Sequence, residues 1–293
     1  MKLTRSGCVV PDTPEIKKEL TVRPIVNADF GVAPPSFKVF RKAKSGLCVP
    51  RYYAEEKFGK VTEDIRPKPE KIKISFKGKL RDETHQNEAL SKAIEAGHGI
   101  LSLPCGFGKT TVSLAIACKL GYRTMIVVHK EFLANQWKER IQQFCPGASI
   151  GIVQQNKKEI NCDFVIAMLQ SLSLKEYSFE DFDSIGTLIV DEAHHICAKV
   201  FSQSLFKLCP KHAFGLSATP NRKDGLTKVL HWFMGPTFFS VERKNQDQVD
   251  MFPLVYTCPR FEDPPPFPRF GQLSLPTMIT ELPEFPDRNR LII

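Results

Sequence analysis

One short stretch constrains the fold of this chain more than any other, the segment Leu103–Thr110 (LPCGFGKT). It follows an apolar run over Gly99–Leu103 and precedes a helix-compatible run over Thr111–Leu120. A strand, a glycine turn and a helix in this order form a cradle for phosphate, because backbone N–H groups and the positive end of the helix dipole point into one concavity. The sequence therefore predicts a nucleotide-binding loop here.

The residue types in this loop fit phosphate chemistry. Gly106 and Gly108 leave no Cβ in the way of a phosphate and permit positive φ. Lys109 would reach the β- and γ-phosphates, and the Thr110 hydroxyl would bind Mg²⁺. The commonest form of the pattern has glycine where Leu103 stands, so a plain glycine turn remains the alternative. The predicted nucleotide-binding residues are Pro104, Cys105, Gly106, Phe107, Gly108, Lys109, Thr110 and Thr111.

The composition sets broad limits on the class of protein. The 293 residues suffice for two domains, and 42% hydrophobic with 25% charged residues is typical of a soluble globular protein. No apolar run approaches the roughly 18 residues of a membrane helix, and Met1–Leu20 lacks a signal-peptide core. Nine cysteines without a C-x-x-C pair argue against zinc or iron–sulfur sites. We expect an intracellular protein, in cytoplasm or nucleus, with no membrane partner.

The positive charge is concentrated in one segment. Between Ser36 and Arg81 there are 14 Lys and Arg residues against 5 Asp and Glu residues, a local balance of +9 that equals the net charge of the chain. Aromatic residues interleave with these charges, which is typical of a nucleic-acid-facing module. A solvated charged surface over a small core is the alternative.

Alternating strand-like and helical runs predict the fold class. Residues 1–69 would form a basic, β-containing N-terminal domain with strands over Ser36–Val49, and Lys71–Lys79 also reads as a strand because apolar and basic residues alternate. Residues 70–258 would form an α/β fold with a parallel sheet covered by helices on both faces, and residues 259–293 a Pro-rich linker. The expected strands are Gly99–Leu103, Thr124–Val128, Ser149–Val153, Asp163–Ala167, Thr187–Val190 and His212–Leu216, and the expected helices are Glu15–Leu20, Glu83–Ala96, Thr111–Leu120, Phe132–Phe144, Lys199–Leu208 and Leu226–Phe233.

Two further motifs follow apolar strands. Leu188-Ile189-Val190 runs into Asp191-Glu192-Ala193-His194, and a carboxylate in this position can hold Mg²⁺ while its neighbour orients the attacking water. Ser217-Ala218-Thr219-Pro220 follows the next strand, where its hydroxyls could bond the acidic motif and transmit nucleotide state. A turn with a helix cap is the alternative for this third motif.

The three motifs, in this order and spacing, resemble motifs I, II and III of superfamily 2 helicases. The resemblance covers about residues 80–293 and implies a first RecA-like lobe of a P-loop NTPase that uses ATP and Mg²⁺. It implies Lys109, Asp191, Glu192 and His194 as catalytic residues, Thr110 and Asp191 as Mg²⁺ ligands, Gln86 as the adenine-reading residue, and Ser217, Ala218 and Thr219 as the coupling motif. The nucleic-acid contacts implied are His129, Lys130, Gln170, Ser171 and Arg222.

Finer features resemble particular branches of the family. Residues 215–225 (GLSATPNRKDG) resemble the transcription factor IIH repair helicases, and residues 46–53 (GLCVPRYY) resemble helicases of large nucleocytoplasmic DNA viruses, of the poxvirus transcript-release and asfarvirus types. The resemblance implies an ATP-dependent DNA helicase or translocase in viral transcription, repair or replication. An RNA helicase, or a P-loop nucleic-acid-binding protein without motor activity, is the alternative.

The resemblance also implies a second RecA lobe that supplies arginine fingers. No Q-x-x-G-R-x-x-R pattern occurs in the sequence, and the apolar end of the chain looks cut, so we expect that lobe in a longer parent and weak hydrolysis without it.

For several single residues the sequence pattern predicts a structural role rather than a functional one. Trp137 and Trp232 fit helical core patterns, His195 next to His194 does not have the spacing of a helical metal pair, and Cys105 fits a small residue in a tight turn. The pair Arg222 and Asp224 either contacts DNA, stabilises the lobe or caps a helix.

Overall fold

The computed structural model describes residues 1–25, 34–219, 221–242, 283 and 286–292. The chain divides into two compact units, Met1–Arg243 and Lys244–Ile293. In the second unit the described residues include helix α10 (Pro286–Ile292), and the rest of the predicted Pro-rich linker lies outside the described residues. The sheets and sites below all belong to the first unit.

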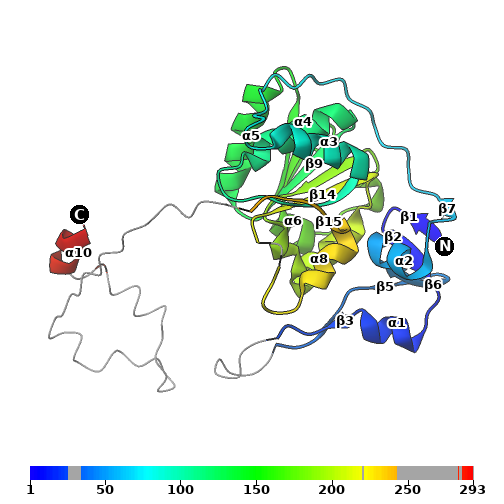
Figure 1. The fold of residues 1–293 in the computed structure, drawn as a ribbon. Helices are drawn as coiled ribbons and strands as arrows, with labels where there is room; N and C mark the ends of the chain where they lie inside the picture. Colours follow the sequence, from blue (N-terminus) through cyan, green and yellow to red (C-terminus); the bar gives the residue numbers. More distant parts are fainter. Residues whose placement is uncertain (26–33, 220, 243–282, 284–285, 293) are drawn as a thin grey trace. The chain divides into compact units, whose positions relative to one another are not determined.

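The predicted α/β fold is confirmed. Within the described residues the larger sheet has eight strands, which are parallel except for the antiparallel edge strand β11 (Figure 1). In sheet order the strands are β11 (Lys157–Lys158), β10 (Ile150–Gln154), β12 (Phe164–Met168), β9 (Thr124–Val128), β13 (Thr187–Val190), β14 (His212–Ser217), β8 (His98–Ser102) and β15 (Thr237–Ser240).

Helices cover both faces of this sheet because its central strands are apolar on both sides. Every residue of β9, β12 and β13 is buried. One face packs against α3 (Gln86–Ala96), α4 (Lys109–Leu120) and α5 (Glu131–Phe144). The other face packs against α6 (Leu169–Leu174), the 3₁₀ segment η3 (Ala193–Cys197) and α8 (Thr227–Met234). The predicted helix over Lys199–Leu208 is instead α7 (Lys199–Ser204) followed by the 3₁₀ turn η4 (Leu205–Lys207).

A small N-terminal β-sheet precedes this fold, as predicted. Its strand order is β5 (Arg41–Ala43), β6 (Gly46–Val49), β2 (Gly7–Val10), β1 (Lys2–Thr4) and β7 (Glu63–Asp64). A separate pair, β3 (Thr21–Val22) and β4 (Phe37–Lys38), follows helix α1 (Pro14–Glu19), which Thr13 caps. The expected single strand over Ser36–Val49 is therefore three short strands, and the hairpin β1–β2 was not predicted because its strands are only three and four residues long.

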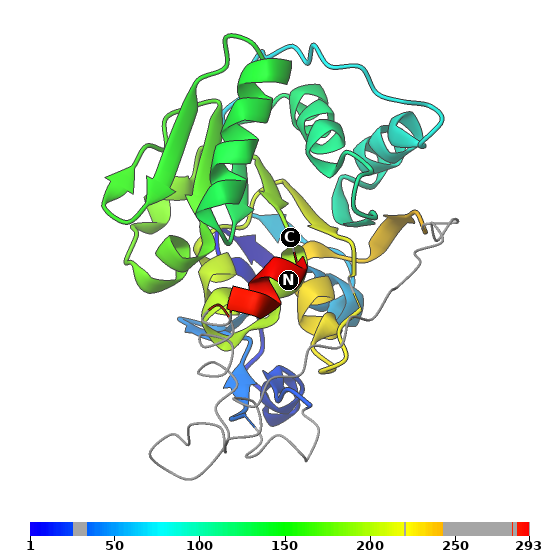
Figure 2. The ribbon, with the colours of Figure 1, turned by 90° about the vertical axis from the view of Figure 1, so that its left-hand side faces the viewer.

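The N-terminal sheet packs on the face of the large sheet that carries α8. Its buried residues, among them Leu3, Val10 and Leu47, belong to the same hydrophobic cluster as Val229 and Leu230 of α8. Figures 1 and 2 show the N-terminal residues (blue) beside α8 (yellow), away from α3, α4 and α5.

Helix α2 (Arg51–Phe58) makes part of this contact, because Tyr53 meets Trp232 edge-on with ring centroids 5.5 Å apart. The domain boundary predicted near residue 69 stays a prediction. No helix in the described ranges is both long enough and apolar enough to span a bilayer.

The predicted strand over Lys71–Lys79 is wrong. This segment is extended, but its one bridge is between Lys71 and Tyr122. Its backbone instead forms hydrogen bonds with the C-terminal ends of two helices. Ile72 N donates to Gly121 O after α4 at 2.9 Å, and Lys77 N donates to Phe144 O at the end of α5 at 2.7 Å. The alternation of apolar and basic residues is real, because Ile74 and Phe76 pack partly buried on the α4–α5 side of the core. We call this segment, residues 71–79, the strap.

Candidate functional site

The phosphate loop joins β8 to α4 and has the backbone geometry that phosphate binding requires. Gly106 and Gly108 have φ angles of 81° and 92°, which residues with a Cβ rarely adopt. A Cβ on Gly108 would lie 2.8 Å from Nε2 of Gln86, whereas a Cβ on Gly106 would meet nothing within 4 Å. The loop therefore packs against protein at Gly108 and is open to solvent at Gly106. Helix α4 begins at the next residue, Lys109, and the N–H groups of its first turn have no partner within the helix.

The other predicted loop residues divide between core and surface. Phe107 is buried and Cys105 is exposed, while Pro104, Thr110 and Thr111 are half-buried. Among the described residues the hydroxyl of Thr110 has no protein hydrogen-bond partner, so it is available to a ligand.

Gln86 holds the phosphate loop from inside. Its side chain is buried, its Nε2 donates to Phe107 O at 2.6 Å, and its Oε1 accepts from Arg81 N at 2.9 Å. Both ends of the amide thus bond the backbone, which fixes the carbonyl next to Gly108. The role of Gln86 in reading adenine stays a prediction.

The acidic motif meets the phosphate loop through one ion pair. Lys109 Nζ donates to Glu192 Oε1 at 3.0 Å, although the two residues are 83 positions apart in the sequence. Glu192 has a φ of 47°, a left-handed conformation that is uncommon for a residue with a Cβ. This backbone bend directly after β13 places the Glu192 carboxylate beside Lys109.

Asp191 lies deeper than Glu192 and is held by Trp137. The indole Nε1 of Trp137 donates to Asp191 Oδ2 at 2.9 Å, and the backbone N of Glu192 donates to Asp191 Oδ1 at 3.0 Å. Burial raises the pKa of the Asp191 carboxyl, while the Trp137 hydrogen bond and the Lys109 charge act in the opposite direction. Trp137 is core, as predicted, but its bond to Asp191 was not predicted. A buried indole N–H usually finds a hydrogen-bond partner, and this tendency is the signal that could have suggested one.

The residues predicted to bind Mg²⁺ fit that ion. Thr110 offers a free hydroxyl, and each Asp191 oxygen that accepts one hydrogen bond keeps a further lone pair. Among the described residues no group of three or more His, Cys, Asp or Glu side chains could hold a metal. Mg²⁺ would therefore take its other ligands from water and phosphate oxygens, as it commonly does.

The third motif contacts the acidic motif directly. Ser217 Oγ lies 3.2 Å from His194 Nδ1 and also accepts a hydrogen bond from Thr219 N at 3.1 Å. The backbone O of Ser217 accepts from Leu103 N at 2.9 Å, which ties this loop to the start of the phosphate loop. Burial, followed by the neighbouring His195, lowers the pKa of His194, which favours the neutral form of the ring. The half-buried Ala218 lies between these bonded residues.

Arg222 is bound within the protein. Its Nη1 donates to His194 O at 2.6 Å, and its Nε donates to Asp224 Oδ1 at 2.9 Å. Asp224 in turn accepts from Leu226 N at 3.2 Å, just before α8. These bonds support the role in stabilising the lobe, and the predicted contact of Arg222 with DNA stays a prediction.

The predicted nucleic-acid residues follow β9 and β12 at the same edge of the sheet. Lys130 and Gln170 are exposed, and Gln170 Nε2 donates to His129 O at 2.7 Å. Ser171 is buried and its Oγ accepts from Gln155 N at 3.0 Å, so its hydroxyl already has a protein partner.

His129 contacts the acidic motif as well. Its ring contacts that of His195 at a tilt of 34° with centroids 4.0 Å apart, and the His195 ring contacts that of His194 at a tilt of 37° and 4.4 Å. The sequence did not predict this row of three histidines, because His129 follows β9 whereas the adjacent His194 and His195 belong to η3.

Comparison with known proteins agrees with this geometry. Residues 77–222 match the family model described as the res subunit of type III restriction enzymes. A protein of Acanthamoeba polyphaga mimivirus, named as an ATP-dependent RNA helicase, is 32% identical over all of this chain and 60% of its own length. A protein of Invertebrate iridescent virus 3, named as a helicase, is 31% identical over 73% of this chain and 69% of its own length. A protein of Sulfurisphaera tokodaii, named as a DNA 3′–5′ translocase, is 32% identical over 57% of this chain and 36% of its own length.

The fold has a solved counterpart in the UvsW helicase of bacteriophage T4, with a TM-score of 0.52 and 14% identity over 77% of this chain and 92% of that one. The chain spans 60% of the mimivirus relative. Motif geometry, family model and relatives agree, and the chain belongs to the superfamily 2 helicases, related to the helicases of giant and iridescent viruses and to archaeal DNA translocases.

Proposed function

We propose that this chain is the ATP-binding part of a motor that couples hydrolysis of ATP, with Mg²⁺, to movement along or separation of DNA strands. The observation that carries the proposal is the 3.0 Å contact between Lys109 Nζ and Glu192 Oε1. It brings the residue predicted to hold the β- and γ-phosphates next to the residue predicted to orient the attacking water.

The ion pair also suggests how the nucleotide enters. Without a phosphate, Lys109 and Glu192 neutralise each other in a half-buried position. A γ-phosphate would replace Glu192 as the partner of Lys109, which leaves the carboxylate free to bond a water molecule. Asp191 and Thr110 would hold Mg²⁺, which neutralises charge on the phosphates, and the bond from His194 to Ser217 would pass the change to the third motif.

Two substitutions with opposite effects on binding test the site. Lys109→Ala removes the phosphate partner, and we expect ATP to bind at least ~10-fold more weakly. Glu192→Gln removes the competing charge, so ATP should bind at least as tightly as to the unmodified chain, while hydrolysis falls by ~100-fold or more. Binding is measured on this chain by equilibrium titration with a fluorescent ATP analogue, and hydrolysis is measured by phosphate release from a longer parent that carries the second lobe. Lys138→Ala, an exposed lysine on α5, is the control.

Two results would contradict the proposal. One is unchanged ATP binding by Lys109→Ala, and the other is unchanged hydrolysis by Glu192→Gln. Either would favour the alternative of a P-loop nucleic-acid-binding protein without motor activity.

We propose DNA rather than RNA as the nucleic acid. The name of the Sulfurisphaera relative and the resemblance of residues 215–225 support DNA, whereas the name of the mimivirus relative supports RNA. Lys130 and Gln170 are exposed at the edge that carries the ATP loops, and in this proposal they would contact a strand backbone. In a longer parent that carries the second lobe, stimulation of hydrolysis by DNA but not by RNA of the same sequence would support our choice, and the reverse result would favour the RNA helicase.

A second RecA lobe belongs to the proposal. Arginine fingers raise the rate of related phosphoryl transfers by about 10³–10⁵, and the resemblance to superfamily 2 helicases implies that the second lobe supplies them. We therefore expect this chain alone to hydrolyse ATP slowly, with or without DNA. The viral relatives support a viral origin. We further propose a role in viral transcription, repair or replication, in host cytoplasm or nucleus, with transcription or repair factors as partners.

A further inference from the structure

A concave site lies where the parallel strands of the large sheet begin, at the end opposite the ATP loops. It is a cavity of about 300 Å³ whose walls come from the β1–β2 turn, from the segment after β7, and from the two loops that precede β13 and β14. The ATP loops follow the carboxyl ends of β8, β13 and β14, so loops before β13 and β14 lie at the other end of the same parallel strands. The cavity is therefore separate from the ATP site. We call it the amino-edge cavity.

The amino-edge cavity carries excess positive charge. Five cationic side chains line it, and the two acidic ones, Asp64 and Asp183, are each paired with an arginine. Asp64 binds Arg66 at 2.7 Å, and Asp183 binds Arg5 at 3.2 Å. The remaining three cations, Lys68, Lys207 and Lys211, have no carboxylate within 4.0 Å in the part of the chain that the structure describes. The lining residues themselves therefore have a formal net charge of +3, the five cations less the two acids, and Glu180, outside the lining, also binds Arg5 at 3.0 Å.

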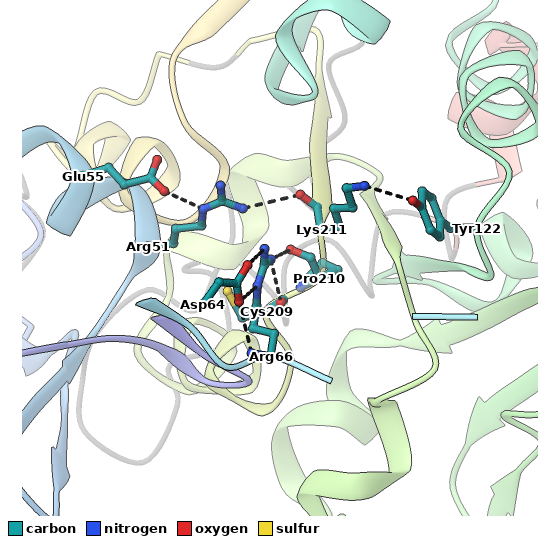
Figure 3. Close-up of polar contacts among 8 residues, drawn as sticks. All are labelled: Arg51, Glu55, Asp64, Arg66, Tyr122, Cys209, Pro210 and Lys211. Atoms are coloured by element: carbon teal, nitrogen blue, oxygen red, sulfur yellow. Dashed lines mark hydrogen bonds and ion pairs between the residues drawn. The ribbon is translucent and has the colours of Figure 1, made fainter. Parts of the chain in front are cut away.

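Arg66, one of the two arginines that line the cavity, is fixed in place (Figure 3). Arg66 Nη1 donates to Pro210 O at 2.6 Å and to Cys209 O at 3.3 Å, while Nε and Nη2 donate to the two Asp64 oxygens. A guanidinium has five N–H groups, so one N–H on Nη2 remains without a partner among the described residues. Arg51 holds the same loop from another side, with Nη1 donating to Lys211 O at 3.4 Å. The Arg66 side chain is therefore already held in one conformation before a ligand binds.

The two lysines on the loop before β14 are held by uncharged partners. Lys207 Nζ donates to Leu172 O at 2.5 Å and also to Lys175 O, and burial lowers its pKa. Lys211 Nζ donates to the hydroxyl of Tyr122 at 2.9 Å, which lowers the pKa of that tyrosine (Figure 3). Neutral acceptors position an ammonium group without neutralising its charge, so both lysines can still attract an anion.

We propose that the amino-edge cavity binds a ligand through its phosphate groups. A charge of about three is met by a multiply charged anion such as a di- or polyphosphate, whereas one carboxylate would leave most of it unpaired. The volume is at the lower end of the range for small-ligand sites. Phe182, Ile185 and Leu208 supply an apolar wall for the rest of the ligand. The phosphate belongs either to a free polyphosphate compound or to a nucleic-acid backbone.

The test uses the exposed lysines, because Lys207 also holds the end of α6. Inorganic pyrophosphate is titrated by calorimetry into the full chain carrying Lys109→Ala, which weakens binding at the ATP loop. Adding Lys68→Ala and Lys211→Ala should weaken the remaining binding by roughly tenfold, because each exposed charge contributes up to about a factor of five. Adding Lys138→Ala instead is the matched control and should change nothing. A single-stranded DNA oligonucleotide is titrated in parallel.

The outcomes separate the sources and the sites. Weaker pyrophosphate binding with unchanged oligonucleotide binding supports a free polyphosphate ligand, and weaker binding of both supports a nucleic-acid backbone. If neither probe binds more weakly to the Lys68 and Lys211 variant than to the Lys138 control, the amino-edge cavity is not a phosphate site. The result does not depend on ATP hydrolysis, so failure of the motor proposal would leave it unaffected.

Discussion

At the scale of single residues, Trp137 both fills the core and stabilises the charged carboxylate of Asp191 through a hydrogen bond. It is buried, and its indole N–H is one of two donors to the carboxylate of Asp191. We expect Trp137→Phe to lower the free energy of unfolding by about 2 kcal/mol, because a hydrogen bond to a charged group is lost from a buried site. It should also raise the pKa of Asp191 further, so that ATP binding requires more Mg²⁺ at pH 7 than in the unmodified chain.

Trp232 provides the control for this measurement. It is also buried, but among the described residues its indole N–H has no hydrogen-bond partner. Urea unfolding of Trp232→Phe should show only the cost of the lost volume and no change in Mg²⁺ dependence. Equal effects of the two substitutions on Mg²⁺ dependence would contradict a specific role for Trp137.

At the scale of elements, the strap shows that an extended segment can stabilise the fold without joining a sheet. Phe76 is partly buried and meets Phe144 at the end of α5, with ring centroids 5.8 Å apart. Phe76→Ala should lower the free energy of unfolding by about 1–3 kcal/mol, less than for a fully buried phenylalanine. Phe132→Ala, which removes a ring that is 62% exposed, should cost less than about 0.5 kcal/mol. Equal urea midpoints for the two variants would show that the strap contributes nothing.

The strap also marks the limit of prediction from sequence. Apolar runs predicted every inner strand from β8 to β14 within two residues, because a strand buried on both faces has few polar positions. In Lys71–Lys79 the alternation correctly predicted which side chains face the core. A period of two cannot show whether a neighbouring strand is available for pairing, and here the neighbours are the ends of α4 and α5.

The same limit applies to the site. The phosphate loop, the acidic motif and the third motif were predictable because each directly follows an apolar strand. The contacts Trp137–Asp191 and His129–His195 were not, because they join a helix face or a loop to a strand end far away in the sequence.

At the scale of the whole molecule, histidines make stability depend on pH. Burial is the largest cause of a lowered pKa at His98, His129, His194, His195 and His212. In the unfolded chain these rings take up protons near pH 6.5, whereas in the folded chain they do so only at lower pH. The unfolded state then binds more protons, so stability is full above pH 6.5 and is lost as the pH falls below it.

Urea unfolding at pH 7.5 and pH 5.5 measures this loss. The free energy of unfolding should be lower at pH 5.5, and the difference should be smaller in a His195→Gln variant, which has one such ring fewer. The lower limit of pH 5.5 lies above the ordinary pKa values of carboxyl groups, 3.8 for Asp and 4.5 for Glu. Stability that is constant or increases on acidification would contradict the assignment.

Strand β14 has a mechanical consequence for the whole molecule. Backbone hydrogen bonds pair it with β13 on one side and β8 on the other, so the three loops that leave these strands start from one stiff frame. Ser217 cannot shift along the sheet relative to Lys109 or Asp191 without breaking that ladder. The three loops therefore keep their positions relative to one another. Under the proposed function, any movement driven by ATP has to come from parts of the protein that are not hydrogen-bonded into this sheet.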